Sequence, residues 1–312
     1  MAVGFTTGEE NYDKDFIASI ILWDYENKKI LYEIKEIYKA VSLLEFSPDD
    51  KFFSAAGLDN TFFTWEVKTG YTCFQRVYEF PITFIYWTKM YKSIDPNTNQ
   101  PLNDNYDYTI TINNNSNLNY LDLFFDARTN KYNLKSRNFT LPSTGFVRDY
   151  TCGFYDEKFD ALYLGTSSGE LVIFSLSNLF FKSSFNVINN GVTDMEFLSE
   201  TDEILISGGD GKIKKISRTM PENVANLDIL KAKHLMTYET LLPGKINSIS
   251  LTSDHKEIVC VSDIGKIFRV LTDNLDYTLH ATAHSSSVND IAFNEVGKVN
   301  DVCFTVDNNG NC

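Results

Sequence analysis

The side chains that could carry out nucleophilic or acid–base chemistry are few in this sequence of 312 residues, which contains 4 histidines. His284 precedes a strand-like run, and Thr305 and Asp307 lie in the next run. A histidine, a hydroxyl and a carboxylate are the residue types of a nucleophilic triad. A nucleophile also needs a cleft and an oxyanion site, and the sequence indicates neither. We therefore predict no catalytic residues and no enzyme activity.

Metal and cofactor sites are not predicted either. The 5 cysteines are scattered and odd in number, and the remaining histidines share no metal-type spacing, so we expect neither a zinc site nor a disulfide framework. The glycine-rich run 207–211 lacks the helix and the lysine–serine pair of a phosphate loop, which makes it a hairpin turn. We expect reduced thiols and incidental histidines at Cys73, Cys152, Cys260, Cys303, Cys312, His234, His255 and His280.

The formal net charge of −14 argues against broad nucleic-acid binding, which needs a positive surface. No run approaches the roughly 20 apolar residues of a membrane span, and the acidic N-terminal region is unlike a secretory signal. We expect a soluble intracellular protein with neither nucleic acid nor membrane as partner. An acidic partner would need a local basic patch on this chain. The alternative for the lysines of such a patch is a solvated strand edge. The candidate contact residues are Lys212, Lys214, Lys215 and Arg218, followed by Lys231 and Lys233.

The elements around these residues follow a repeat with a period of about 40 residues. The clearest copy spans residues 41–72: SLLEFS, a turn preset by Pro48, KFFSAAG, a tight turn at Asp59, and TFFTWEV with Trp65. An earlier third strand, SIILWDY, carries the dipeptide Trp23-Asp24. Strands of this kind, rich in aromatic residues and separated by Gly/Asp turns, are typical of half-buried sheets. A sandwich is the alternative, and the internal repeat argues against it.

Later copies keep the order of elements and lose the tryptophan, with Asp210 and Asp263 at the turn position of Asp59. We predict an all-β WD-repeat propeller of four-stranded blades, with about six blades or an incomplete ring of about seven. An Asn-rich insertion is expected at 93–105. As a single domain over 1–312, its blade-like units are expected near 1–38, 40–80, 81–140, 146–188, 192–242 and 245–283, with a partial unit at 285–312.

Both ends of the sequence fall inside a repeat. The chain starts with a second-strand pattern, AVGFTTG, and stops after DVCFTVDNNG, where a third strand is due. The terminal pieces could share a composite blade that removes exposed strand edges. Because a second-strand pattern occurs at both ends, closure would duplicate one strand, and we favour a fragment of a longer protein.

Several stretches resemble the family of cilia- and flagella-associated WD-repeat proteins that line the lumen of axonemal doublet microtubules. The general ones are IILWDYENKKIL, LEFSPDDKFFSAAG and LYLGTSSGELVIF, and the most specific is the segment 244–293. The Asn-rich insertion and residues 221–233 depart from the family pattern. The resemblance implies tandem propellers, of which this chain is most of the first, and it implies tubulin and other doublet inner proteins as partners.

The same resemblance implies structural roles for the signature residues. In the family pattern the imidazole of His284 bonds a strand hydroxyl and a turn carboxylate, here Thr305 and Asp307, in a buried network. Trp23 and Trp65, at the third-strand position, are expected to pack between blades. Asp24 completes the Trp-Asp dipeptide, and Asp59, Asp210 and Asp263 are expected to accept hydrogen bonds from backbone N–H groups of their turns.

The predicted function is a non-catalytic scaffold in the axoneme, a microtubule inner protein that stabilises ciliary doublets. One alternative is a WD-repeat adaptor of another cytosolic complex, which localisation would separate from the first. The other is a propeller enzyme with ionisable groups gathered on the first strands. Those strands carry no repeated His or Glu set, although Asp149, Asp194 and Asp290 stand at comparable early positions.

Overall fold

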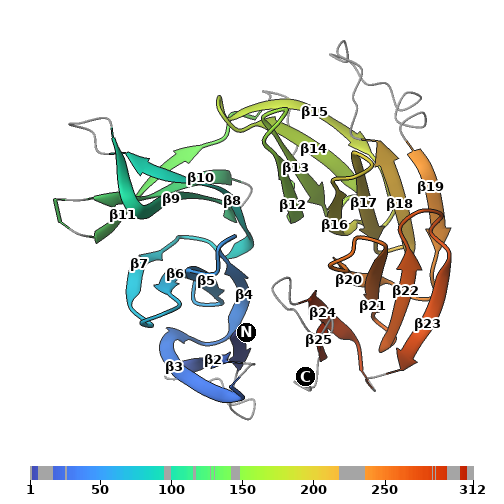
Figure 1. The fold of residues 1–312 in the computed structure, drawn as a ribbon, viewed down its shortest axis with the longest axis horizontal. Coiled ribbons are helices and arrows are strands. Elements are labelled where there is room, and N and C mark those ends of the chain that lie inside the picture. Colours follow the sequence, from blue (N-terminus) through green and yellow to red (C-terminus); the bar gives the residue numbers. More distant parts are fainter. Residues whose placement is uncertain are drawn as a thin grey trace. The chain divides into compact units, whose positions relative to one another are not determined.

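The fold consists of antiparallel sheets made from strands that are consecutive in the chain (Figure 1). The computed structural model describes residues 2–5, 17–24, 27–94, 100–114, 117–126, 128–129, 131–141, 148–217, 236–282, 284, 286–293 and 303–307. The chain divides into two compact units, unit 1 (Met1–Leu141) and unit 2 (Pro142–Cys312). Among the described residues, no helix is long and apolar enough to cross a membrane.

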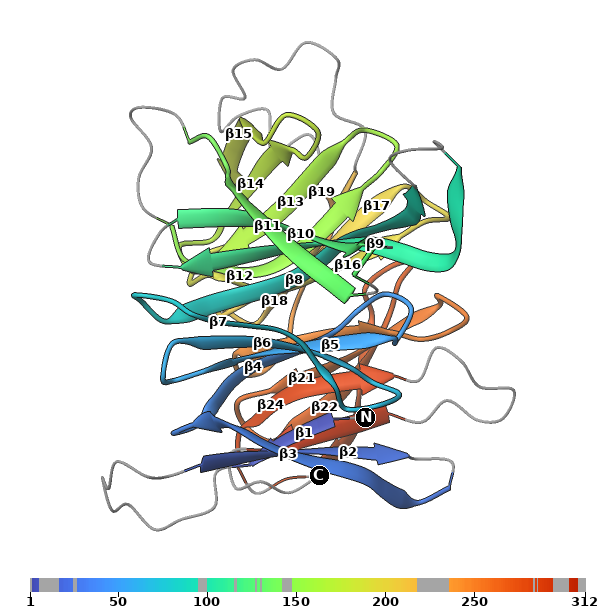
Figure 2. The ribbon, with the colours of Figure 1, turned by 90° about the vertical axis from the view of Figure 1, so that its left-hand side faces the viewer.

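Unit 1 contains one three-stranded and two four-stranded sheets, which lie as successive layers in Figure 2. The first is formed by β1 (Ala2–Phe5), β2 (Ile17–Asp24) and β3 (Lys29–Tyr38). The second is formed by β4 (Val41–Phe46), β5 (Phe52–Gly57), β6 (Thr61–Glu66) and β7 (Thr72–Val77). The third is formed by β8 (Ile82–Ile94), β9 (Pro101–Asn114), β10 (Asn117–Asp126) and β11 (Lys131–Asn138).

Unit 2 contains three four-stranded sheets and one two-stranded sheet. The first is formed by β12 (Tyr150–Asp156), β13 (Ala161–Thr166), β14 (Glu170–Ser175) and β15 (Phe180–Asn186). The second is formed by β16 (Val192–Leu198), β17 (Glu203–Gly208), β18 (Lys212–Ser217) and β19 (Met236–Leu241). The third is formed by β20 (Ile246–Leu251), β21 (Glu257–Ser262), β22 (Lys266–Leu271) and β23 (Tyr277–Thr282), and the last by β24 (Val288–Phe293) and β25 (Cys303–Asp307).

These sheets confirm the predicted all-β class with four-stranded antiparallel blades. The assignment of residues 1–312 to a single propeller domain, with the predicted unit boundaries, stays a prediction. The third sheet of unit 1 departs from the short strands of the other repeats, because β8 and β9 have 13 and 14 residues. Ile94 on β8 pairs with Pro101 on β9. Both ends of the expected Asn-rich insertion 93–105 therefore belong to paired strands. Residues 95–99 of the insertion lie outside the described residues.

One backbone irregularity recurs in six sheets and shows the repeat at the level of geometry. The register between the first strand and the second strand shifts at the second residue of the first strand, as in a β-bulge. A bulge increases strand twist and changes the direction of nearby side chains. We therefore expect the side chain that follows the bulge to be reoriented in the same way in each first strand. The shifts lie at Val41/Leu43, Ile82/Phe84, Tyr150/Cys152, Val192/Asp194, Ile246/Ser248 and Val288/Asp290.

The hydrophobic core lies between consecutive sheets within each unit. β5 and β13 are buried at every position, which is typical of strands that are covered on both faces and therefore read as continuous apolar runs. Phe52 on β5 and Trp87 on β8 belong to the cluster between the second and third sheets of unit 1. Because the inner strands are buried, the residues open to a partner or ligand lie in the turns, on the outer strands and at the ends of the sheets.

Candidate functional site

His284 lies in the loop before β24 and is bonded to two side chains of β25. Its Nδ1 lies 3.1 Å from Oδ2 of Asp307, and its Nε2 lies 2.8 Å from Oγ1 of Thr305. Thr305 and Asp307 are two residues apart on one strand, so they face the same side. The structure thus brings together the three residues that the sequence singled out.

The geometry of this group resembles a catalytic triad, but its environment does not. The side chains of His284 and Asp307 are 8% and 0% exposed, and both ring nitrogens are within hydrogen-bonding distance of a partner, so a substrate cannot reach the imidazole. The turn at Gly265 packs against the same loop, since a Cβ added there would lie 2.4 Å from the carbonyl oxygen of His284. The hydrogen bonds of His284 join the loop before β24 to β25. The buried imidazole leaves no space beside it in which a substrate could bind.

The turn aspartates accept backbone hydrogen bonds. Asp59 accepts from the N–H of Tyr38 at 2.8 Å and of Thr61 at 3.1 Å. Asp263 accepts from the N–H of Lys245 at 2.9 Å, and Asp210 from the N–H of Lys212 at 3.1 Å. Tyr38 and Lys245 both lie in segments that lead into a first strand. Asp59 and Asp263 therefore fix the entry of the chain into their own sheets.

The two signature tryptophans differ in burial. Trp65 is fully buried, stacks on Phe53 and Phe63 at 5.0 Å each, and donates through Nε1 to Oε2 of Glu36 at 3.3 Å. Because Glu36 lies on β3, this side chain joins the first and second sheets of unit 1. Trp23 is half-buried on β2, and Asp24 accepts from Asn27 in the turn that follows.

The basic residues on β18 do not form the open surface expected from the sequence. Lys214 donates to the carbonyl oxygen of Val187 at 2.7 Å, and Lys215 reaches the carbonyl oxygens of Thr272 and Asp273 at 3.0 Å each. The residues Lys214 and Lys215 are 9% and 4% exposed.

Lys212, the remaining described member of this group, is paired with Glu239 at 2.9 Å. Arg218, Lys231 and Lys233 lie outside the described residues. Lys214 and Lys215 are buried because β18 is covered on both faces. Their ammonium groups must therefore find hydrogen-bond acceptors or carboxylates inside the protein. The third strands ELVIFS and TFFTWE are also buried at their central positions. Their apolar residues are visible in the sequence and could have predicted that the centre of β18 is buried.

Asp194 is an ionisable group on a first strand that sequence reasoning left without a role. Its Oδ2 accepts from Oγ of Ser248 at 2.8 Å and from the N–H of Ile249 at 2.9 Å, both on β20. Burial raises the pKa of Asp194 to about 6, against these hydrogen bonds, which lower it. Asp290 occupies the matching position on β24, and Asp149 is exposed before β12. The carboxylate of Asp194 thus bonds one sheet to the next.

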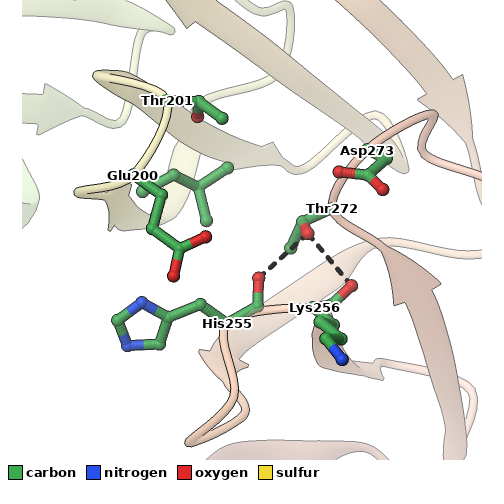
Figure 3. A pocket seen from close by; sticks show the side chains of 7 residues that line it. Glu200, Thr201, His255, Lys256, Thr272 and Asp273 are labelled. Atoms are coloured by element: carbon green, nitrogen blue, oxygen red, sulfur yellow. Dashed lines mark hydrogen bonds between the residues drawn. The ribbon is translucent and has the colours of Figure 1, made fainter.

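A small pocket lies on the turns of the second and third sheets of unit 2 (Figure 3). Leu198, Glu200, Thr201, His255, Lys256, Thr272 and Asp273 line its volume of about 60 Å³. The side chain of Glu200 points toward His255, and Thr272 donates to the carbonyl oxygens of His255 and Lys256 at 2.9 and 3.0 Å. Water occupies about 30 Å³ per molecule in the liquid, so this pocket suits water and not a substrate.

A larger cavity of about 500 Å³ lies between the second and third sheets of unit 1. Its lining combines the aromatic side chains of Phe52, Tyr71, Phe125 and Tyr132 with charged groups and the thiol of Cys73. Nothing in the sequence pattern indicated this site, because its residues come from the start of β5, the region of the β6–β7 turn, β9 and the region of the β10–β11 turn. Within the described part of the chain, no group of His, Cys, Asp and Glu side chains is arranged to hold a metal ion.

A known protein is similar to this chain in sequence. No protein-family model matches the chain. Cilia- and flagella-associated protein 52 of Chlamydomonas reinhardtii is 25% identical over 306 residues, an alignment that covers 93% of this chain and 43% of that protein. The chain therefore spans less than half of the length of this relative. The match agrees with the resemblance predicted from the sequence.

Solved structures are similar to the chain in fold. The β-propeller domain of Cps50 (Swd1) from Myceliophteria thermophila has a TM-score of 0.64 at 12% identity, with 88% of this chain and 85% of that chain covered. A chain of the Mitotic Checkpoint Complex has a TM-score of 0.61 at 12% identity, with 87% and 73% covered. The chain has the fold of WD-repeat β-propellers, and its sequence is similar over 93% of its length to a cilia- and flagella-associated protein.

Proposed function

We propose that the chain is a non-catalytic scaffold of the ciliary or flagellar axoneme, where it binds inside doublet microtubules as a microtubule inner protein. Tubulin and neighbouring inner proteins are its proposed partners. The observation that carries this proposal is the similarity in sequence to a protein named for cilia and flagella, which extends over 93% of the chain.

The scaffold role is supported by the use that the fold makes of its ionisable groups. His284, Asp194 and Lys215 bond loops, strands and neighbouring sheets to one another. A rigid body with such internal bonds loses little conformational entropy when it assembles. Weak contacts repeated along a lattice then add through effective concentration.

The test is retention of the tagged protein in isolated axonemes. We expect the protein to remain with doublets after membranes are removed with detergent and after a salt wash that releases proteins from the outer doublet surface. We further expect an added protease to cleave it only after the doublets are opened. A known outer-surface protein serves as the matched control for both steps.

Two outcomes would contradict the proposal. Release by salt together with the outer-surface control would exclude a position inside the doublet. A diffuse cytosolic signal, with the protein in a soluble complex, would support the alternative of an adaptor in another multiprotein assembly.

A further inference from the structure

β24 carries side chains of the kind that bond one first strand of unit 2 to the next. We propose that β24 is a docking site for an extended strand of a protein partner, which carries a serine or threonine at the position that Ser248 has on β20. The inference rests on the proposed scaffold function, because it names the chemistry of a partner. It does not depend on the ciliary location.

The first strands of unit 2 contact one another in series. β12 contacts β16, β16 contacts β20, and β20 contacts β24 (Figure 1). Each of these strands has its register shift at the second residue, so residues on different strands can be compared by position. The third residues of the four strands, in chain order, are Cys152, Asp194, Ser248 and Asp290.

The second residue of a first strand can bond the backbone of the next first strand. Oγ1 of Thr151 on β12 donates to the carbonyl oxygen of Val192, the first residue of β16, at 2.7 Å. Nδ2 of Asn247 on β20 donates to the carbonyl oxygen of Val288, the first residue of β24. Asn289 on β24 has the same amide at the same position, and this residue is exposed. It therefore presents a donor for the carbonyl oxygen of a further strand.

Asp290 repeats the carboxylate by which β16 holds β20. On β16 the second residue bonds within its own sheet, and Oδ2 of Asp194 accepts instead from Oγ of Ser248 at 2.8 Å and from the N–H of Ile249 at 2.9 Å. Oδ1 of Asp194 and Oδ1 of Asp290 each accept from the N–H of the residue that follows, at 2.8 Å. The two carboxylates are thus held in the same way, but Asp290 is exposed.

The opposite side of β24 is packed against the third sheet of unit 2. Val288 and Ile291 are buried in a cluster with Val259, Val261 and Ile267 from β21 and β22. The strand is therefore already formed and held in place. A partner strand that binds to it orders few groups of this chain, which reduces the entropy lost on association.

The bonding groups of β24 select the occupant. A partner strand has to offer a carbonyl oxygen to Asn289, and a hydroxyl and an N–H to Asp290. An apolar side chain at the hydroxyl position would cover the carboxylate without bonding it, and a carboxylate there would be repelled.

A second copy of this chain is a poor occupant. Two copies repel each other, because the net charge of each is −14. The first strand with the required hydroxyl, β20, is moreover already bonded to β16 through Ser248. The occupant is therefore a strand of a different protein.

The experiment measures binding of a fluorescein-labelled peptide, KINSISLT, which copies residues 245–252 and thus the strand that Asp194 holds. One control peptide has valine in place of the serine that corresponds to Ser248, and another has a methyl group on the nitrogen that corresponds to Ile249. We expect saturable binding of KINSISLT to the full chain and about tenfold weaker binding of each control, the effect of one hydrogen bond to a charged group. Amide hydrogen exchange in β24 should slow on binding.

Matched variants locate the binding. Asp290→Ala and Asn289→Ala change exposed residues of β24 and are expected to weaken binding of KINSISLT, Asp290→Ala by about tenfold. Asp276→Ala removes an exposed carboxylate between β22 and β23 and should leave binding unchanged. Far-ultraviolet circular dichroism confirms that each variant keeps its strands.

Several results would overturn the inference. They are no saturable binding up to about 1 mM, equal binding of the valine peptide, or an equal effect of Asp290→Ala and Asp276→Ala. Equal binding of a peptide with lysine in place of the serine would show a general cation site, and faster exchange in β20 would show that the peptide displaces that strand. A concentration-dependent dimer that Asp290→Ala abolishes would make a second copy of this chain the occupant.

The experiment also separates this inference from the proposed function. If peptide binding fails while axonemal retention persists, only this inference fails. If retention fails while peptide binding persists, only the ciliary proposal fails.

Discussion

The ammonium group of Lys215 lies 3.2 Å from the carboxylate of Glu203 inside unit 2, where the two side chains are 5% and 12% exposed. The same ammonium group donates to the carbonyl oxygens of Thr272 and Asp273, which follow β22 in the next sheet. A lysine in the middle of a third strand thus bonds its own sheet to the turn of a neighbouring one.

Replacement of Lys215 by alanine is expected to lower the free energy of unfolding by about 3–5 kcal/mol, because it removes the ammonium group that lies beside the buried carboxylate of Glu203. Chemical denaturation measures this loss. Lys35→Ala is the matched control, since Lys35 pairs with Glu33 at the surface with 58% and 41% exposure, and it should change stability by less than about 1 kcal/mol. The double variant Lys215→Met, Glu203→Leu should recover most of the loss. Similar effects of Lys215→Ala and Lys35→Ala would refute the buried pair.

Replacement of His284 by alanine is expected to cost about 1–3 kcal/mol, because the buried carboxylate of Asp307 and the half-buried hydroxyl of Thr305 lose their shared partner. The loss should be local: amide hydrogen exchange should accelerate in β24 and β25 and remain unchanged in β12 to β15. His280→Ala is the control, since His280 is exposed on β23. Unaltered exchange in β24 and β25 would show that the network does not hold these strands.

Asp194 should make stability depend on pH. Its pKa in the folded protein, about 6, lies above the value of about 3.9 for an unfolded chain, so the folded state binds the proton more tightly. The contribution of Asp194 to stability is therefore greatest below about pH 4, falls as pH rises to about 6, and stays lower above it, by at most about 3 kcal/mol.

The variant Asp194→Asn removes this titration, so the difference in unfolding free energy between the two proteins should change over the window from about pH 4 to about pH 6. Denaturation at several pH values measures it. Asp254→Asn tests the sign, because hydrogen bonds, first that of Thr252, lower the pKa of Asp254 and its contribution must be lost as pH falls. Parallel profiles for wild type and Asp194→Asn would exclude the assigned titration.

Trp65 should matter more to stability than Trp23. Trp65→Ala empties a site between the first two sheets, where the side chain is 0% exposed, and is expected to cost about 3–5 kcal/mol. Trp23→Ala should cost less, because the side chain is half-buried and already partly in contact with water. Thermal unfolding of both variants compares them, and a greater loss for Trp23→Ala would contradict the packing seen here.

Local features were predictable because local chemistry produces them. The strands expected in residues 41–72 correspond to β4, β5 and β6, since apolar runs and the turns at Pro48 and Asp59 are set by neighbouring residues. The grouping of His284 with Thr305 and Asp307 was implied by the family resemblance, whose pattern places each of these residues relative to a strand.

The sequence by itself therefore determined the class of the fold, the order of the strands and the turns between them. The direction of Lys214 and Lys215, the bonds of Asp194 to β20 and the cavity at Cys73 were decided only by the tertiary structure. Each depends on which sheet covers a given strand. A charged residue on a strand covered on both faces must find its partner in another sheet, and strand periodicity carries no information about that partner.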